Sequence, residues 1–247
     1  MKEIFSKQNN FIKDLKKQKL KNRFLLFLDN PKSINDAVSF GLTPSLVLVD
    51  KEKLNKFSIP GGAEVVLTSE EIIKMFADTI TPQGIVAVFN FAPKTPKVPT
   101  GNFLVLDGLQ DAGNIGTLIR SALGANFQDV FLIDCAHITN PKIVRSSMSA
   151  VLRLKVYEMT RADFCAFSKE NNLNLAKCDM DGENIFEKTP SLPIGIVVGS
   201  EGSGISYEIS ALCQTSISIP MSNGLESLNA GVSGSIIMFE ITNKKGK

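Results

Sequence analysis

Short apolar runs alternate with helix-like segments along almost the whole chain, and this alternation limits the possible folds more than any other feature. Strand-like runs lie at 24–29, 45–50, 65–68 and 84–89, with helical patterns at 34–40 and 69–76. Further strand-like runs lie at 103–107, 130–134, 173–179, 194–200 and 216–221. Strands that alternate with helices predict an α/β fold. Apolar stretches such as 194–198 are typical of central parallel strands that are buried on both faces.

A proline-rich segment interrupts this alternation, where Pro93, Pro96 and Pro99 favour an extended, semi-rigid linker. The chain has 247 residues, enough for two compact units of unequal size. We therefore predict a smaller α/β/α domain at 1–92, a linker at 93–100 and a larger α/β domain with a parallel sheet at 101–247.

Composition excludes several classes of protein. Hydrophobic residues make up 43% of the chain and charged residues 21%, which excludes a disordered protein. No apolar run approaches the roughly 20 residues that span a bilayer, so a membrane protein is not expected. The basic start is not followed by the apolar region of a secretory signal. We therefore expect a cytoplasmic protein.

The few cysteines and the single histidine limit the chemistry further. Cys135, Cys165, Cys178 and Cys213 form no C-x-x-C pair, and His137 is the only histidine. A zinc site and a histidine base are therefore not expected. We expect buried free thiols, and we expect His137 in a loop that follows a strand.

Positive charge gathers at the N-terminus. Residues 1–25 contain eight Lys or Arg against Glu3 and Asp14, a net charge of +6, whereas the whole chain carries +2. The apolar face of a helix in this region would consist of Phe11, Ile12 and Leu15. The lysines outside that face suit a phosphate-rich partner. Charge alone fits a solvated helix face equally well.

Glycine-rich turns follow several strands, but the common nucleotide-binding signatures are not met. Segment 199–206 superficially resembles a phosphate-binding P-loop, yet Ile205 stands where the lysine should be. The dinucleotide pattern G-x-G-x-x-G fails because Gly202 and Gly204 are followed by Tyr207 in place of the third glycine. An NAD or ATP site is therefore not expected.

Segment 106–122 joins a predicted strand to a predicted helix through a polar loop. Asn114 is a good helix N-cap. The apolar face of the helix would consist of Ile115, Leu118, Ile119 and Ala122. Arg120 points away from this face and is free to meet an anion, although an ordinary exposed arginine would look the same.

Two further segments combine strand ends with small residues. In 196–206 a buried strand ends in a loop that holds Glu201, and its small neighbours let a ligand reach the backbone. In 217–240 a strand and a turn precede a helix that Ser227 or Asn229 could cap. A sharp turn and tight helix packing explain each segment taken alone.

In this order, the three segments resemble the three motifs of the SpoU (TrmH) group of RNA ribose 2'-O-methyltransferases, within the SPOUT superfamily. The first motif matches Asn114 and Arg120, and the G-x-E-G core of the second matches Gly199, Glu201 and Gly202. The third motif matches Ile219, Pro220, Met221, Ser227, Leu228 and Asn229. The likeness extends over nearly the whole chain, with departures such as Ala112, where the family often has proline.

The resemblance implies a fold and a cofactor. The second domain would be threaded as a trefoil knot, a rare exception to ordinary chain topology. It would bind S-adenosylmethionine mainly through backbone groups and act as a homodimer, without a metal. The cofactor-binding residues implied are Gly199, Ile219, Met221, Ser227 and Leu228.

The resemblance also implies roles for four side chains in the attack of a ribose 2'-hydroxyl on the sulfonium methyl group. Arg120 corresponds to the catalytic arginine of the family. A guanidinium has a pKa above about 12 and makes a poor base. We therefore expect Arg120 to bind a neighbouring phosphate and to stabilise developing alkoxide charge. Asn114 and Asn229 would orient the ribose or Arg120, and Glu201 would brace the loops.

The first domain resembles a ribosomal-protein-like RNA-binding fold. Ribosomal RNA is favoured over tRNA as the substrate, because tRNA-directed relatives often lack such a domain. One alternative is a catalytically silent RNA-binding or ribosome-assembly protein that keeps the fold. Another is an unrelated α/β enzyme that acts on a small metabolite.

Overall fold

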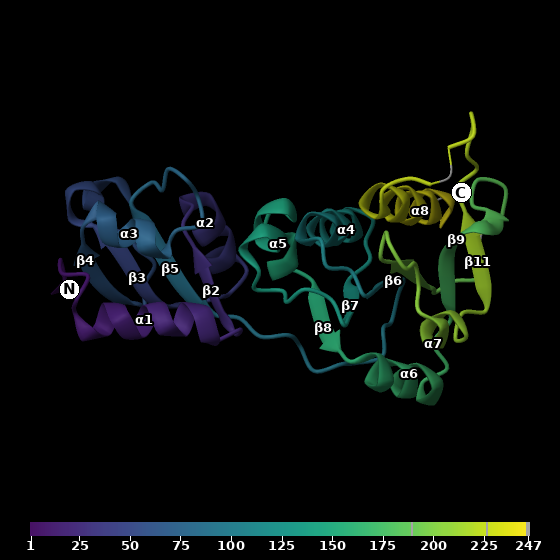
Figure 1. Cartoon of the computed structure of the whole chain (residues 1–247), viewed down its shortest axis with the longest axis horizontal. Coiled ribbons are helices and arrows are strands. Elements are labelled where there is room, and N and C mark those ends of the chain that lie inside the picture. Colours follow the sequence, from purple (N-terminus) through teal and green to yellow (C-terminus); the bar gives the residue numbers. More distant parts are fainter. Residues whose placement is uncertain (189, 226, 246–247) are drawn as a thin grey trace. The chain divides into compact units, whose positions relative to one another are not determined.

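The computed structural model describes residues 1–188, 190–225 and 227–245. The chain divides into two compact units, shown in Figure 1. Unit 1 comprises residues 1–92 and 139–141, and unit 2 comprises residues 93–138 and 142–247. No helix within the described ranges is long and apolar enough to cross a membrane.

Unit 1 is built on a mixed five-stranded sheet with the strand order β1-β4-β3-β5-β2. Strands β1, β4 and β3 run parallel to one another, whereas β5 is antiparallel to both β3 and β2. The elements are β1 (Lys2–Glu3), α1 (Asn10–Lys21), β2 (Leu25–Leu28), α2 (Pro31–Ser39), β3 (Pro44–Asp50), the 3-10 helix η1 (Lys51–Lys56), β4 (Glu64–Thr68), α3 (Glu70–Phe76) and β5 (Ile85–Asn90).

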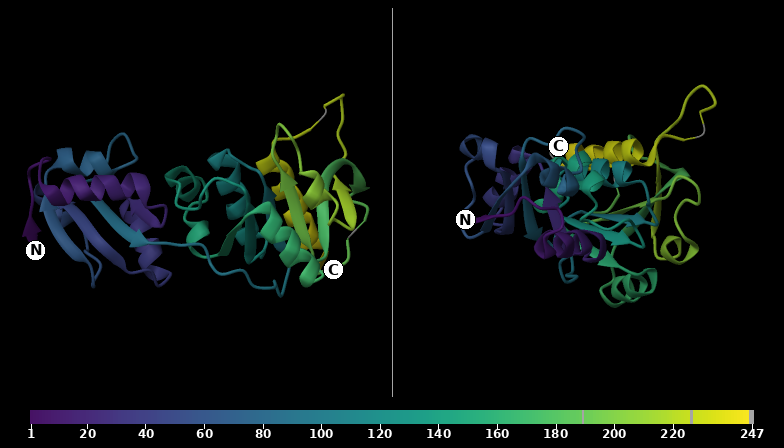
Figure 2. Two further views of the ribbon diagram at one scale, coloured as in Figure 1. Left: turned by 60° about the horizontal axis from the view of Figure 1, so that its bottom comes forward. Right: turned by 60° about the vertical axis from the view of Figure 1, so that its left-hand side comes forward.

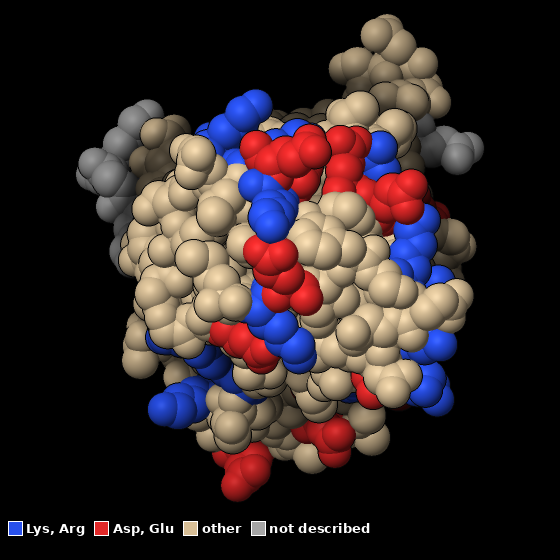
Figure 3. All heavy atoms as spheres, turned by 90° about the vertical axis from the view of Figure 1, so that its left-hand side faces the viewer, with Lys and Arg blue, Asp and Glu red and all other residues tan. Residues whose placement is uncertain are grey.

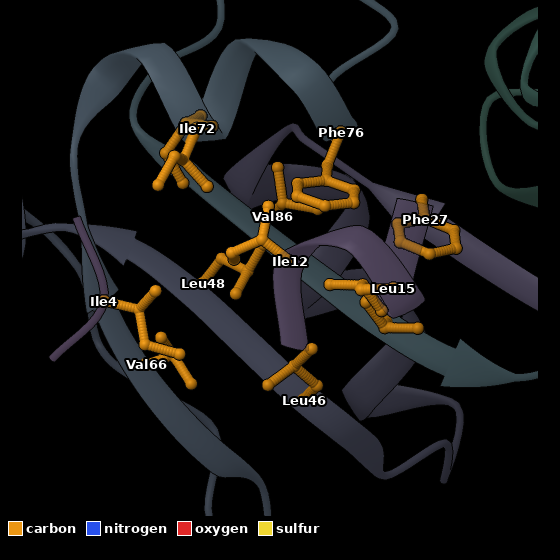
Figure 4. Close-up of a cluster of buried hydrophobic side chains, with 12 residues drawn as sticks. Ile4, Ile12, Leu15, Phe27, Leu46, Leu48, Val66, Ile72, Phe76 and Val86 are labelled. Carbon is orange, nitrogen blue, oxygen red and sulfur yellow. The ribbon is translucent and has the colours of Figure 1, made fainter. Parts of the chain in front are cut away.

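Helices cover both faces of this sheet because side chains on a strand alternate between its two faces. Figure 4 shows Ile12 of α1 and Phe76 of α3 packed against Leu48 of β3 on one face. In the left view of Figure 2, α1 and α3 lie along the same side of the strands. The neighbouring strand residue Val47 is also fully buried, as is Ala37 of α2, and we assign α2 to the second face.

Unit 2 contains a six-stranded sheet with the order β11-β9-β10-β6-β7-β8, and all five pairings are parallel. The predicted parallel sheet is confirmed, with β10 at a central position. The elements are β6 (Phe103–Asp107), α4 (Ala112–Gly124), β7 (Asp129–Ile133), α5 (Pro141–Ser146), the 3-10 helix η2 (Ala150–Leu152), β8 (Lys155–Met159), α6 (Arg161–Glu170), β9 (Leu175–Asn184), β10 (Gly195–Gly199), α7 (Tyr207–Ser210), β11 (Thr215–Ser218) and α8 (Ala230–Lys245).

Two layers of helices enclose the sheet of unit 2. In Figure 1, α4 and α8 lie on one side of the sheet, and α6 and α7 lie on the other. The α6 side holds a cluster of aromatic rings in which the ring centroid of Phe131 lies 4.8 Å from that of Tyr157 and 5.5 Å from that of Phe164. On the opposite side, α8 lies against α4 at Gly234. A β-carbon added to Gly234 would lie 2.5 Å from Leu118 Cδ2, so a larger residue here would require the Leu118 side chain to shift.

The proline-rich segment that precedes β6 contacts the outer strand of the sheet. Residues 91–99 adopt no helix or strand. Lys94 nevertheless donates its backbone N–H to the carbonyl of Val156 at 2.8 Å. Strand β8 is an edge strand, so this bond engages a peptide group that no neighbouring strand pairs.

Candidate active site

The sheet topology of unit 2 brings the carboxyl ends of β6 and β10 side by side at a point where the strand order changes direction. Strand β6 is followed by β7 on one side, whereas β10 is bordered by β9 on the other side. In open α/β sheets, ligands bind outside the carboxyl ends of the strands at such a switch point. Two of the three segments selected from the sequence follow the carboxyl ends of β6 and β10.

Three polar side chains, one from each segment, form a connected cluster. Asn114 donates its Nδ2–H to Glu201 Oε1 at 2.8 Å. Asn229 donates from its own Nδ2 to the same Oε1 at 2.7 Å and to Asn114 Oδ1 at 3.0 Å. A single carboxylate therefore holds two asparagines that are 115 positions apart in the chain.

The sequence predicts the N-cap of α8 correctly but places the N-cap of α4 at the wrong residue. Asn114 does not cap α4: the helix begins at Ala112, and Asp111 accepts the backbone N–H of Gly113 at 2.8 Å. An aspartate three positions earlier supplies the cap, which leaves the Asn114 side chain free for Glu201. Asn229 does cap α8, because its Oδ1 accepts the N–H of Val232 at 3.2 Å.

Arg120 lies on the exposed side of α4, as the helical pattern predicts. It forms no hydrogen bond or ion pair with any residue that the structure describes. The opposite side of the helix is buried by Ile115, Leu118, Ile119 and Ala122. The guanidinium therefore remains available to an anionic ligand.

A cavity of about 420 Å³ opens beside the middle of β9 and at the carboxyl ends of β10 and β11. All five residues predicted to bind the cofactor line this cavity: Gly199, Ile219, Met221, Ser227 and Leu228. Glu201 also lines it, and Asn114 is joined to the cavity through Glu201. The structure thus gathers the predicted residues around one space, whereas their roles remain predictions.

Sequence reasoning missed one wall of the cavity. Lys177, Cys178, Asp179 and Met180 of β9 line it, whereas the sequence pattern predicts only a strand at 173–179. No local motif marks these residues. The long strand β9 lies between β10 and β11, and this position in the sheet brings its residues 177–180 to the cavity. The sequence could have revealed these residues only if it had predicted that β9 pairs with β10.

The loop after β10 closes on itself at Gly199. Ser200 and Gly204 exchange backbone hydrogen bonds of 3.1 and 2.9 Å, which folds the intervening residues into a tight turn. A β-carbon on Gly199 would overlap the backbone of Gly204 and Ile205. Glycine at 199 is therefore required for the turn that carries Glu201.

A buried carboxylate fixes the far end of this loop. Asp107, at the end of β6, is 1% exposed and accepts the backbone N–H of Ser206 at 2.7 Å. Its other oxygen accepts two bonds from Arg161 of α6, at 3.2 and 3.0 Å. The hydrogen bond to Asp107 raises the pKa of Arg161, so this guanidinium stays protonated at any physiological pH.

The cysteines and the histidine take no visible part in the site chemistry. All four cysteines are free, as predicted, but each is half-buried rather than fully buried. Burial raises the pKa of Cys178 to about 12, so this thiol in the cavity wall is uncharged near neutral pH. His137 lies in the loop after β7, as predicted, with Nε2 3.0 Å from Glu158 Oε2. Within the described part of the chain, no cluster of His, Cys, Asp or Glu could hold a metal ion.

The close approach at Gly199 leads to a testable difference between two glycines of one turn. Gly199→Ala should lower the free energy of unfolding of unit 2 by about 3 kcal/mol, because the new methyl group overlaps backbone that cannot rotate away. Gly202→Ala is the matched control, since no atom lies within 4 Å of its added β-carbon, and its effect should stay within about 0.5 kcal/mol. Urea denaturation of both variants measures the difference. Equal stability of the two would contradict the described turn.

Comparisons with known proteins agree with this geometry. The SpoU rRNA Methylase family matches residues 101–239, which is more than half of the chain. The 23S rRNA (guanosine(2553)-2'-O)-methyltransferase RlmP of Bacillus subtilis is 26% identical over 250 residues, which cover 98% of this chain and 99% of that protein. An uncharacterized tRNA/rRNA methyltransferase of Synechocystis, slr1673, is 28% identical over 179 residues, which cover 70% of this chain and 65% of its own length.

Solved structures show the same fold over nearly the full length. A TrmH-family protein from Porphyromonas gingivalis superposes with a TM-score of 0.83 at 28% identity, covering 98% of this chain and 99% of that one. An rRNA methyltransferase from Sinorhizobium meliloti, solved with AdoMet bound, has a TM-score of 0.85 at 21% identity and covers 98% of each chain. The resemblance inferred from the three motifs is confirmed, and the chain belongs to the SpoU rRNA Methylase family.

Proposed function

We propose that this protein transfers a methyl group from S-adenosylmethionine to a ribose 2'-hydroxyl in RNA, with ribosomal RNA as the substrate. One observation carries the proposal: Asn114, Glu201 and Asn229 are hydrogen-bonded to one another at the rim of the cavity that the predicted cofactor residues line. The B. subtilis relative, which aligns over its whole length, is named for 2'-O-methylation of 23S rRNA and supports the choice of substrate.

The cavity fits the proposed cofactor in size and in chemistry. Sites for ligands of this size enclose about 300–1,000 Å³. Ile219, Met221 and Leu228 belong to no helix or strand, so their peptide groups are not used in a regular ladder and can bind a ligand. Val198, Ile217 and Ile237 supply apolar surface for a purine and a thioether chain. When bound, the cofactor supplies an electrophilic methyl group on a sulfonium centre.

The residues of this chain would orient the acceptor and stabilise charge. The planar fork of the Arg120 guanidinium can bind the phosphate next to the target ribose. The same cation stabilises the alkoxide character that develops as the 2'-hydroxyl attacks. Asn114 and Asn229 each keep a fixed orientation because Glu201 accepts a hydrogen bond from both. A fixed amide dipole beside the ribose favours the aligned attack geometry.

We further propose that unit 2 is threaded as a trefoil knot, as the family resemblance implies. The contact between Asn229, which precedes the last helix, and Glu201, in the loop after β10, supports this threading. Unit 1 would bind RNA without reading its sequence, since phosphate contacts give affinity alone.

A homodimer of unit 2 is the third part of the proposal. The first ten residues of α8 (230–239) include no charged side chain, and on its outer stripe Val232 is 46% and Phe239 50% exposed. Large apolar side chains exposed together are typical of an interaction surface. The ring of Phe239 lies over Gly124 of α4, so α4 and α8 together offer a surface for a second copy.

Removal of the guanidinium should separate catalysis from cofactor binding. Arg120→Ala should lower the rate of methyl transfer by about 100-fold or more, the usual effect of losing one charge-stabilising donor. Its affinity for S-adenosylmethionine should remain within about twofold, since Arg120 does not line the cavity. The assay uses labelled S-adenosylmethionine and rRNA from a host that lacks this protein, and alkali-resistant positions identify 2'-O-methylation. Cofactor binding by the wild type without any labelled RNA, with ribosomal subunits also tried, would instead favour the silent RNA-binding protein.

Three lysines on the outer side of α1 should carry the salt-dependent part of RNA binding. Lys13, Lys16 and Lys21 are exposed and form no ion pair with any described residue. Changing all three to Gln should lower the slope of log K against log salt by about two, at about 0.7 per phosphate contact with single-stranded RNA. The measurement is a salt titration of RNA binding by fluorescence anisotropy.

The control for this experiment comes from another surface of unit 1. The end of unit 1 seen in Figure 3 carries acidic and basic side chains next to each other. The paired lysines of unit 1 include Lys7 with Glu71 at 2.8 Å, Lys51 with Glu3 at 2.9 Å and Lys74 with Glu70 at 2.6 Å. Replacing Lys7, Lys51 and Lys74 by Gln should leave the slope unchanged. An equal loss in both triple variants would argue against a specific role of α1.

Disruption of the apolar stripe on α8 should dissociate the dimer. Phe239→Asp introduces a charge at the centre of the proposed interface, where an unpaired carboxylate would be desolvated. Light scattering coupled to gel filtration should report one chain for this variant and two for the wild type. Phe186→Asp, at a residue 48% exposed in unit 2, is the matched control and should remain dimeric. A monomeric wild type would refute this part of the proposal.

A further inference from the structure

The cavity contains an ion pair that the proposed reaction does not use. Lys177 Nζ lies 2.7 Å from Asp179 Oδ2, and both residues line the cavity. They are two positions apart on β9, so their side chains leave the strand on the same face. Their side chains are 29% and 35% exposed, which places them at the open edge rather than in the deep wall.

Both members of the pair keep unused hydrogen-bonding capacity. An ammonium group has three donors, and Asp179 engages one donor of Lys177. Asp179 accepts from Lys177 on one oxygen and from the N–H of Asp181, at 3.3 Å, on the other, and each oxygen has a second lone pair. The mutual hydrogen bond raises the pKa of Lys177 and lowers that of Asp179, so both groups are ionised near neutral pH.

Charge in the cavity matches the proposed cofactor group by group. Among the described lining residues, Lys177 is the one cation, and Asp179 and Glu201 are the two carboxylates. S-adenosylmethionine carries one carboxylate, one ammonium group and one sulfonium centre, so the signs and numbers of charges are opposite. Glu201 already accepts hydrogen bonds from Asn114 and Asn229, whereas neither Lys177 nor Asp179 has a described hydrogen bond to any other side chain.

We propose that Lys177 and Asp179 form the subsite for the α-amino-acid end of the cofactor, an inference that depends on the proposed function. The ammonium group of Lys177 binds the carboxylate of the ligand, and the carboxylate of Asp179 binds its α-ammonium group. The amino-acid end of the ligand is a zwitterion, so each of its two charged groups lies next to a protein group of opposite charge. Both contacts are charge-assisted hydrogen bonds. The subsite thereby selects adenosyl compounds that carry an amino acid.

The test compares two ligands that share the nucleoside and differ in the amino acid. S-adenosylhomocysteine has the zwitterionic end, and 5'-methylthioadenosine lacks it. Isothermal titration of the full-length protein should show tighter binding of S-adenosylhomocysteine. Lys177→Met should weaken that binding about 10- to 100-fold, the equivalent of one charge-assisted hydrogen bond, and leave 5'-methylthioadenosine within about twofold.

A control at Lys188 and a variant of Asp179 test whether the effect is specific to the ion pair in the cavity. Lys188 pairs with Glu183 at an exposed position outside the cavity, so Lys188→Met should change neither affinity. Asp179→Asn should weaken S-adenosylhomocysteine selectively, as Lys177→Met does. Unchanged binding of 5'-methylthioadenosine also shows that each variant is folded around the cavity.

Each other outcome overturns the proposal in a recognisable way. An equal loss for both ligands in Lys177→Met would mean that the pair supports the cavity wall only. Unchanged binding of both ligands would mean that the amino acid binds elsewhere, and the proposed methyl transfer would still stand. A wild-type protein that binds neither ligand would refute the proposed function together with this subsite.

Discussion

The site depends on one buried carboxylate. Asp107 ends the central strand β6, and it accepts hydrogen bonds from the backbone of Ser206 and from Arg161. It therefore joins the carboxyl end of β6 to the loop that follows the neighbouring strand β10. Without a partner, a carboxylate that is 1% exposed would be strongly destabilised by burial. Because it is paired on both oxygens, it fixes the loop instead, and Glu201 in that loop acquires a defined position.

Short-range contacts that begin at the loop held by Asp107 position the other residues of the site. Glu201 holds Asn114 and Asn229, and Asn229 in turn caps α8. Helix α8 can lie close to α4 because glycines face the contact. Ser235 donates to Ser121 at 2.7 Å along the same helix pair. Asn229 thus belongs both to the N-cap of α8 and to the polar cluster of the site.

Much of this architecture could be predicted from the sequence, and the exceptions have physical reasons. The apolar runs predict the buried strands, and the helical spacing of apolar residues predicts that Arg120 is exposed. The cap of α4 was misplaced because Asp111 and Asn114 are both good cap residues, and only the tertiary bond to Glu201 decides between them. The wall formed by β9 was missed because its residues gain their position from strand order, which no local pattern encodes. The left-handed turn at Met148 and Ser149 was likewise hidden, since non-glycine residues rarely adopt positive φ.

The hydrogen bond from Lys94 to Val156 shows that the proline-rich segment does more than connect the two units. An edge strand with unpaired peptide groups invites pairing with other chains, and proteins avoid this by covering the edge or placing proline beside it. The segment does both, since it supplies a backbone partner for β8 and its three prolines offer no N–H groups for further strand addition. It therefore covers part of the exposed edge of the sheet of unit 2 and also links the two units along the chain. A fragment that begins at residue 101 would lack this hydrogen bond, so the edge of β8 would stay uncovered there although all six strands of the sheet were present.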